Sequence, residues 1–136
     1  MTQPTTAVWV SGLLAAAIHI LVFVFESLLL RLPAVHHGVF GMHAEDVAPV
    51  RLWGWGVGVY NLAIGMVTGL LLWWGGDVEA GRALVVYICL IMVLGGISLV
   101  AAVAMGLYRE GAARKGLGGA IGESLPALVI LGALAF

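Results

Sequence analysis

Apolar residues fill four long runs of the chain, and short polar stretches separate these runs. The runs cover residues 7–30, 52–74, 83–107 and 120–136. A transmembrane helix needs about 20 mostly apolar residues to cross a hydrocarbon core roughly 30 Å thick. The runs are continuous rather than alternating, which favours helices over a β-barrel, because backbone polar groups in lipid must be satisfied within the segment. The pattern predicts an all-α membrane protein, an antiparallel bundle of four transmembrane helices that forms one integral membrane domain over residues 1–136.

Composition supports the membrane class and excludes several others. The chain is 62% hydrophobic and only 10% charged, unlike an ordinary soluble domain. The first run is not expected to be a cleaved signal peptide, because no basic residue precedes it and it contains Glu26. Cys89 is the only cysteine, which excludes an intrachain disulfide and a thiolate metal cage. The few basic residues of the chain do not form the basic patch that binds nucleic acid. Neither a nucleic-acid partner nor a cofactor is expected.

Charge distribution predicts the orientation of the bundle. With four spans, residues 31–51 and 108–119 share one side, whereas both termini and residues 75–82 share the other. Five of the 6 basic residues lie on the first side, namely Arg31, Arg51, Arg109, Arg114 and Lys115. The positive-inside rule therefore predicts a multi-pass protein of the cell membrane with both termini outside the cytoplasm.

The inner faces of the helices are predicted from small and polar residues, since lipid is as apolar as leucine. Such residues recur at helical spacing in every run. The predicted stripes are Gly12, Ala16, His19, Phe23, Glu26 and Leu30; Gly54, Gly58, Asn61, Gly65 and Thr68; Gly95, Ser98, Ala102 and Gly106; and Gly119, Gly122 or Glu123, Pro126 and Ile130. Ordinary helix packing is the simplest role for the glycines, and the GxxxG spacing also favours a homo-oligomer.

Ionisable groups within the runs are the candidate chemistry. A carboxylate at membrane depth costs about 3 kcal/mol, so Glu26 should face the bundle interior or a wet cavity. His19 and Glu26 are seven residues apart, hence on one face and about 10 Å apart along the axis. Asn61 is expected at the depth of His19, and Glu123 nearer the cytoplasmic ends with Glu26. These positions predict a polar cleft entered from the cytoplasmic leaflet, with His19 and Asn61 as its floor and Glu26 and Glu123 as its rim.

Each polar group also has a simpler interpretation. Glu26 could pair with Arg31, Arg51 or Arg109, and Glu123 could interact with the positive end of a helix dipole. His19 and Asn61 could form ordinary hydrogen bonds between helices.

The long loop at residues 31–51 contains four residues that break helices, Pro33, Gly38, Gly41 and Pro49. It is expected to be irregular or to hold one short interfacial helix. Its histidines and carboxylates, namely His36, His37, His43, Glu45 and Asp46, suggest a metal site, but their spacing matches no known motif such as HExxH. A solvated or interfacial loop without metal is the expectation.

Four short stretches resemble a known family. They are "IHILVFVFES", "VFG", "GVYN" and "LPALVILGAL". The chain resembles the small bacterial and fungal integral membrane proteins classed as domain of unknown function 1304. This resemblance implies a small membrane fold and supplies no activity. A looser similarity exists to sterol isomerase-like membrane proteins, in which His and Glu side chains inside a helical bundle handle protons on an isoprenoid.

Three functions are compatible with the sequence. The first is an intramembrane acid-base site that acts on a lipophilic substrate such as an isoprenoid, by isomerase-type or cyclase-type proton transfer. Its candidate catalytic residues are Glu26 as proton donor, His19 as acceptor or relay, Asn61 and Tyr60 as substrate-orienting groups, and Glu123 at the rim. The second is a small proton-coupled transporter subunit with Glu26 as the coupling site. The third is a non-catalytic lipid-binding or scaffolding protein. In each case the expected partner is a membrane lipid or another lipophilic small molecule.

Overall fold

The computed structural model describes residues 3–62 and 65–135, and this part of the chain is helical, with no strand. Its elements are α1 (Thr6–Phe23), η1 (Val24–Leu28), α2 (Pro33–His36), α3 (Ala44–Leu62), α4 (Gly65–Trp74), α5 (Val78–Ala104) and α6 (Ala113–Ala135). In the described part of the chain, four segments are long and apolar enough to cross a membrane, namely Thr6–Leu28, Ala44–Trp74, Val78–Ala104 and Ala113–Ala135. The predicted four-helix membrane fold is confirmed. Phe136, the predicted end of the fourth run, lies outside the described residues.

Three helices begin earlier than the apolar runs predict. The structure starts α3 at Ala44 rather than 52, α5 at Val78 rather than 83, and α6 at Ala113 rather than 120. Hydropathy marks the part of a helix that suits lipid, whereas backbone hydrogen bonding continues into polar flanks. At the start of α5, for example, Oδ1 of Asp77 accepts a hydrogen bond of 3.3 Å from the Ala80 amide and caps the helix.

The long loop is partly helical and is fixed to the start of α6. The predicted short helix is present as α2, but Pro49 lies inside α3 rather than breaking a helix. Nδ1 of His36 donates to the Leu30 carbonyl oxygen at 3.1 Å. Lys115 donates through Nζ to the carbonyl oxygens of His37 and Gly38. Polar contacts therefore join the long loop to the start of α6 at this end of the molecule.

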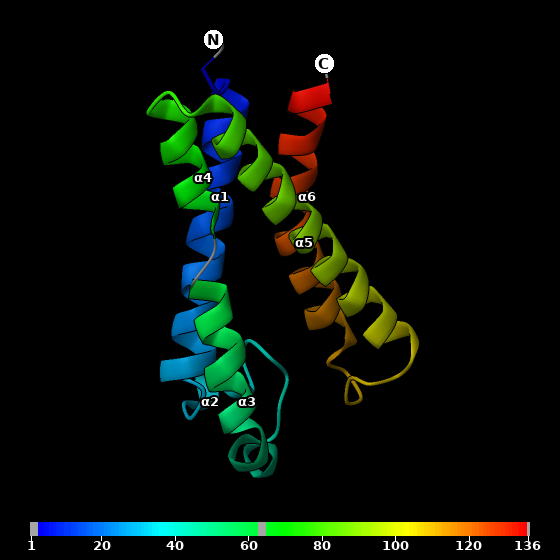
Figure 1. The fold of residues 1–136 in the computed structure, drawn as a ribbon. Coiled ribbons are helices and arrows are strands. Elements are labelled where there is room, and N and C mark those ends of the chain that lie inside the picture. The colour runs from blue at the N-terminus through cyan, green and yellow to red at the C-terminus, as the bar shows by residue number, and fades with distance from the viewer. Residues whose placement is uncertain (1–2, 63–64, 136) are drawn as a thin grey trace.

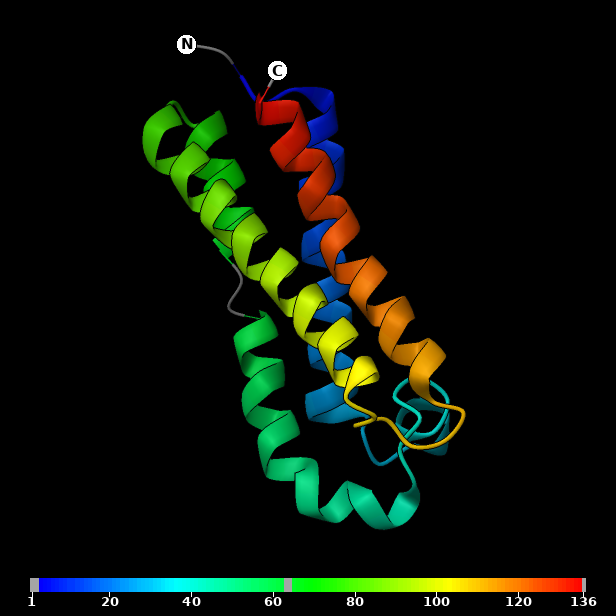
Figure 2. The same ribbon diagram turned by 90° about the vertical axis from the view of Figure 1, so that its right-hand side faces the viewer.

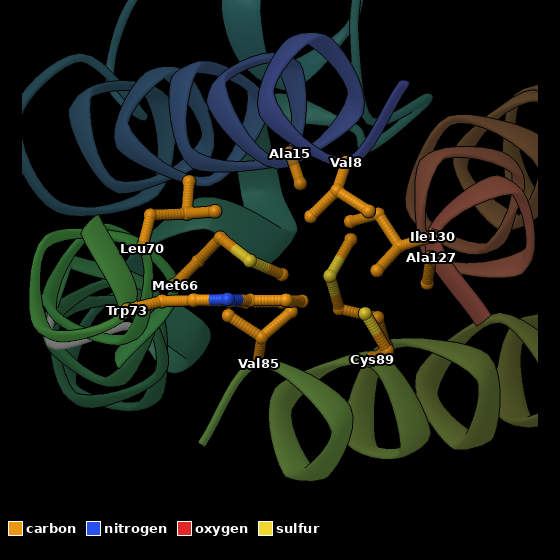
Figure 3. Packing of buried hydrophobic residues seen from close by; sticks show 10 residues of the cluster. Val8, Ala15, Met66, Leu70, Trp73, Val85, Cys89, Ala127 and Ile130 are labelled. Carbon is orange, nitrogen blue, oxygen red and sulfur yellow. The ribbon is translucent and has the colours of Figure 1, made fainter. Parts of the chain in front are cut away.

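The hydrophobic core is formed around α4, which lies in the half of the bundle that holds both termini (Figure 1, Figure 2). Side chains from α1, α4, α5 and α6 converge there (Figure 3). They are Val8, Ala15, Met66, Leu70, Trp73, Val85, Cys89, Met92, Ala127 and Ile130. Many large apolar side chains outside this core are exposed, as expected for helix faces that contact lipid.

The other half of the bundle is more open. α3 packs mainly on α1 and η1, whereas α5 packs mainly on α4 and α6. Figure 1 shows the lower parts of α3 and α5 diverging toward the end that carries α2. Two helix pairs, η1 with α3 and α5 with α6, therefore flank the polar residues of this half.

The predicted inner stripes are correct for the first run and partly wrong for the others. Gly12, Ala16, His19 and Leu30 are buried, but Thr68, Ser98, Gly106 and Gly119 are exposed. α4 instead buries Met66, Gly69, Leu70 and Trp73, and α5 buries Gly81, Val85, Cys89, Met92 and Gly96. The pattern of small and polar residues gave a wrong inner face for these helices, because large apolar residues are also buried there. Ser98, moreover, donates its hydroxyl to the Gly95 carbonyl of its own helix at 2.7 Å and needs no partner on a neighbouring helix.

Candidate functional site

Glu26 occupies the middle of a π-helical turn. η1 continues directly from α1, and the Leu29 amide donates to the Val24 carbonyl, five residues earlier, at 3.0 Å. Such turns are rare and often occur at functional sites. Because the wider turn changes the angular register, the side chains that follow Phe23 point in directions that a regular helix would not give them. The prediction that His19 and Glu26 lie on one face of the helix assumed a regular α-helix and did not take this turn into account.

Asn61 holds the carboxyl group of Glu26. Its Nδ2 donates to Oε2 of Glu26 at 3.2 Å, joining α3 to η1. Asn61 therefore lies at the level of Glu26, which corrects the prediction that it shares the depth of His19. That prediction assumed that the second helix begins near residue 52, whereas α3 begins at Ala44.

A close approach of α3 to η1 makes this hydrogen bond possible. Gly58 is buried, and a Cβ atom at this position would overlap Oγ of Ser27. At Gly54 an added Cβ would lie 3.3 Å from the Glu26 carbonyl oxygen. Ser27 in turn donates to the Trp55 carbonyl oxygen at 3.3 Å. Glycine on α3 thus lets the polar side chains of η1 lie directly against the helix backbone.

Glu123 approaches the same site from α6. Its carboxyl group lies against Gly95 of α5, where an added Cβ would overlap Oε1. The Glu26 and Glu123 carboxyl groups are also close enough for their charges to interact. The structure therefore brings together Glu26, Asn61 and Glu123 from three different segments. The role of Gly95 was missed, because the sequence shows a small residue but not the carboxyl group beside it.

His19 is buried but is held within its own helix. Its Nδ1 donates to the Ala15 carbonyl oxygen at 2.9 Å. A carbonyl oxygen only accepts, so Nδ1 carries a hydrogen, and in the neutral form of the ring Nε2 is the acceptor nitrogen. Within the described residues, no hydrogen bond links His19 to Glu26, Asn61 or Glu123.

Tyr60, the tyrosine that the sequence suggested for this site, lies elsewhere. The Tyr60 side chain is 81% exposed on the outer face of α3, so the structure does not bring it to Glu26. Tyr108 packs its ring against Gly116 at the start of α6. The substrate-orienting role of Tyr60 stays a prediction.

Two hollows adjoin Glu26 on different faces of α3. One, of about 320 Å³, is lined by Glu26, Ser27, Leu28, Leu30, Arg31, Arg51, Leu52 and Trp55. The other, of about 160 Å³, is lined by Glu26, Leu30, Phe40, Met42, Val50, Trp53, Gly54 and Val57. A larger hollow of about 660 Å³ lies at the turn before α5, but a single segment, residues 76–86, supplies all of its lining. This hollow is an open part of the surface. The two hollows beside Glu26 are more relevant to the candidate site.

The simpler ion-pair interpretation of Glu26 does not hold among the described residues. Arg109 pairs instead with Asp46, at 2.8 Å, and lies 3.6 Å from Glu45. No ion pair of Glu26 with Arg31 or Arg51 is present in this part of the chain. The histidines of the long loop are also dispersed, and the described residues contain no group of three or more His, Cys, Asp or Glu side chains that could hold a metal ion.

Comparison with family models gives a match over most of the chain. The model of the family described as "Protein of unknown function (DUF1304)" matches residues 13–135. Neither the curated proteins nor the solved structures include a significant match to the chain.

Proposed function

Because the chain belongs to the DUF1304 family, whose description names no activity, we propose a function from the site itself. The proposed function is an intramembrane acid-base site that transfers protons on a lipophilic substrate such as an isoprenoid. The observation that carries it is the Glu26 carboxyl group, hydrogen-bonded to Asn61 and close to Glu123 within the membrane-spanning part of the chain.

Two interacting carboxyl groups can hold a single proton, so that one donates while the other accepts. In the proposed reaction Glu26 adds a proton to one carbon of a carbon–carbon double bond, which leaves a carbocation at the other carbon. Glu123 then takes a proton from the next carbon along the chain, adjacent to the carbocation. The double bond moves, no atom is gained or lost overall, and the proton returns to Glu26. A cyclisation would use the same first step.

Two of the other predicted residues, Asn61 and His19, have supporting roles in this proposal. Asn61 positions the Glu26 carboxyl group, and His19 offers Nε2 as a proton acceptor deeper in the bundle. The mostly apolar hollow of about 160 Å³ gives a lipophilic chain a place beside Glu26. Tyr60 has no role in this scheme.

Orientation is part of the same proposal. The connection from η1 to α3 and the connection from α5 to α6 lie at the end of the bundle opposite the two termini (Figure 1). These connections and the first turns of α3 and α6 carry Arg31, Arg51, Arg109, Arg114 and Lys115. In a cell membrane, this charge bias favours that end for the cytoplasm. Glu26 and Glu123 would then lie in the cytoplasmic half of the bilayer.

Comparison of membrane lipids tests the proposal. Lipids extracted from cells that produce the wild-type protein should contain a species that is lost when Glu26→Gln replaces it. Glu110→Gln, an exposed carboxyl group in the loop before α6, is the matched control and should resemble the wild type. A full product level from Glu26→Gln, with equal amounts of both proteins in the membrane, would contradict the proposed role.

Proton-coupled transport is a second candidate, favoured by a different observation. Glu26 and Glu123 belong to the two helix pairs that diverge in the lower half of the bundle (Figure 1). A substrate-dependent pH change inside proteoliposomes that requires Glu26 would support this function.

Retention of all biological function by both His19→Ala and Glu26→Gln would instead favour a non-catalytic lipid-binding or scaffolding role.

A further inference from the structure

Two arginines line the larger hollow beside Glu26. Arg31 follows η1 and Arg51 belongs to α3, and the hollow between them measures about 320 Å³. Neither side chain has a hydrogen bond or an ion pair with any other described residue. By contrast, Arg109 is paired with Asp46, and Lys115 donates to loop carbonyl oxygens. The hollow therefore carries two guanidinium groups with unused donors.

The rest of the lining is mostly apolar. Leu28, Leu52 and Trp55 border the hollow, and all three side chains are exposed. Arg51 and Trp55 are four residues apart and share one face of α3. Arg31 lies three residues beyond the first membrane span, which ends at Leu28. These positions correspond to the boundary between hydrocarbon and headgroups, where arginine and tryptophan are both favoured.

We propose that this hollow binds the phosphate group of an anionic membrane lipid. The planar guanidinium groups of Arg31 and Arg51 match the geometry of phosphate oxygens. An acyl chain of the same lipid would lie along Leu28, Leu52 and Trp55. The lining contains two cationic side chains and one acidic residue, Glu26, whose carboxyl group accepts a hydrogen bond from Asn61. This binding site does not depend on the proposed proton transfer.

Binding of defined lipids to the purified full-length protein tests the proposal. The probes are phosphatidic acid, zwitterionic phosphatidylcholine and inorganic phosphate, and binding is measured in detergent by native mass spectrometry. Phosphatidic acid should bind at least about tenfold more tightly than phosphatidylcholine. Arg31→Gln combined with Arg51→Gln should weaken phosphatidic acid binding by about tenfold or more, since two charge-assisted contacts are lost. Arg114→Gln, which removes an exposed arginine outside the hollow, should leave binding unchanged.

Further measurements separate the alternatives. If the glutamine variant fails to insert or fold, Arg31→Lys with Arg51→Lys retains both charges and should still weaken binding several-fold, because lysine cannot form the bidentate contact. Unchanged phosphatidic acid binding in the folded variants would overturn the proposal. Equal affinity for phosphatidylcholine, or inorganic phosphate binding as tightly as the lipid, would overturn the anionic-lipid assignment.

Discussion

At the residue scale, the Glu26 carboxyl group depends on neighbours from two other helices. Asn61 donates to it from α3, and Glu123 approaches it from α6. Glycine makes both arrangements possible, because Gly58 lets α3 reach η1 and Gly95 leaves room for the Glu123 carboxyl group. The glycines of this half of the bundle therefore determine where the polar groups lie, in addition to packing the helices.

A double-mutant cycle tests the link between Glu26 and Asn61. Glu26→Ala, Asn61→Ala and the double variant should show a coupling free energy of about 0.5–2 kcal/mol, as for other hydrogen bonds within membrane proteins. Unfolding of the purified protein in mixed micelles with increasing SDS gives the required stabilities. The control cycle pairs Asn61→Ala with Glu79→Ala, an exposed residue at the other end of the bundle, and should give no coupling. Absence of coupling in the first cycle would contradict the observed contact.

Sequence alone identified the polar residues of the site but not their pairing. Glu26, Asn61 and Glu123 are noticeable because ionisable and amide groups are costly in lipid. Their grouping depends on the π-helical turn and on the early start of α3, and neither feature leaves a signal in the residue pattern. His19 was expected to share the site, but its Nδ1 donates a hydrogen bond to the Ala15 carbonyl oxygen of its own helix.

At the element scale, the four spans were predictable, whereas their ends and inner faces were less so. A long apolar run is a strong signal, since crossing a bilayer requires it. Helix starts such as Ala44 and Ala113 lie in polar sequence, where hydropathy carries no information about backbone conformation. Inner faces were predicted best in α1, where small and polar residues coincide with burial. They were predicted poorly in α4 and α5, where Met66, Val85 and Met92 fill the core.

The contact between α4 and α5 offers a test at this scale. A Cβ atom at Gly81 would overlap the Trp73 amide nitrogen and would lie 2.7 Å from the Gly69 carbonyl oxygen. Both are backbone atoms, which cannot move aside as a flexible side chain does. Gly81→Ala should therefore lower the free energy of unfolding by about 1–3 kcal/mol.

Gly122→Ala is the matched control for this substitution. Gly122 lies inside α6, and an added Cβ atom there would meet nothing within 4 Å. Because alanine favours helix more than glycine does, this variant should be unchanged or more stable by up to about 1 kcal/mol. Equal thermal unfolding midpoints for the two variants in detergent would contradict the close approach of α4 and α5.

At the scale of the whole molecule, packing and polar chemistry are separated along the bundle. The hydrophobic core occupies the half with the termini (Figure 1, Figure 3). Glu26 and Asn61 belong to the pair of η1 and α3, and Glu123 belongs to the pair of α5 and α6. None of these three residues belongs to the hydrophobic core, so substitutions at the site should affect function more than folding.

The proposed orientation of the whole bundle is tested by cysteine labelling. Cys89 is buried, and Cys89→Ala provides a background without thiols. In this background, Glu79→Cys should react with a membrane-impermeant maleimide added to intact cells, because it lies at the end with the termini. Glu110→Cys at the opposite end should react only after the cells are opened. The reverse pattern would place both termini in the cytoplasm.

Deuterium transfer tests the central claim most directly. Membranes that contain the protein are incubated in D₂O, and the extracted lipids are analysed for carbon-bound deuterium by mass spectrometry. If Glu26 donates a solvent-exchangeable proton to a lipophilic substrate, the wild-type protein and Glu110→Gln should label one lipid species that Glu26→Gln leaves unlabelled. Identical lipid labelling by the wild type and Glu26→Gln would contradict proton transfer at Glu26.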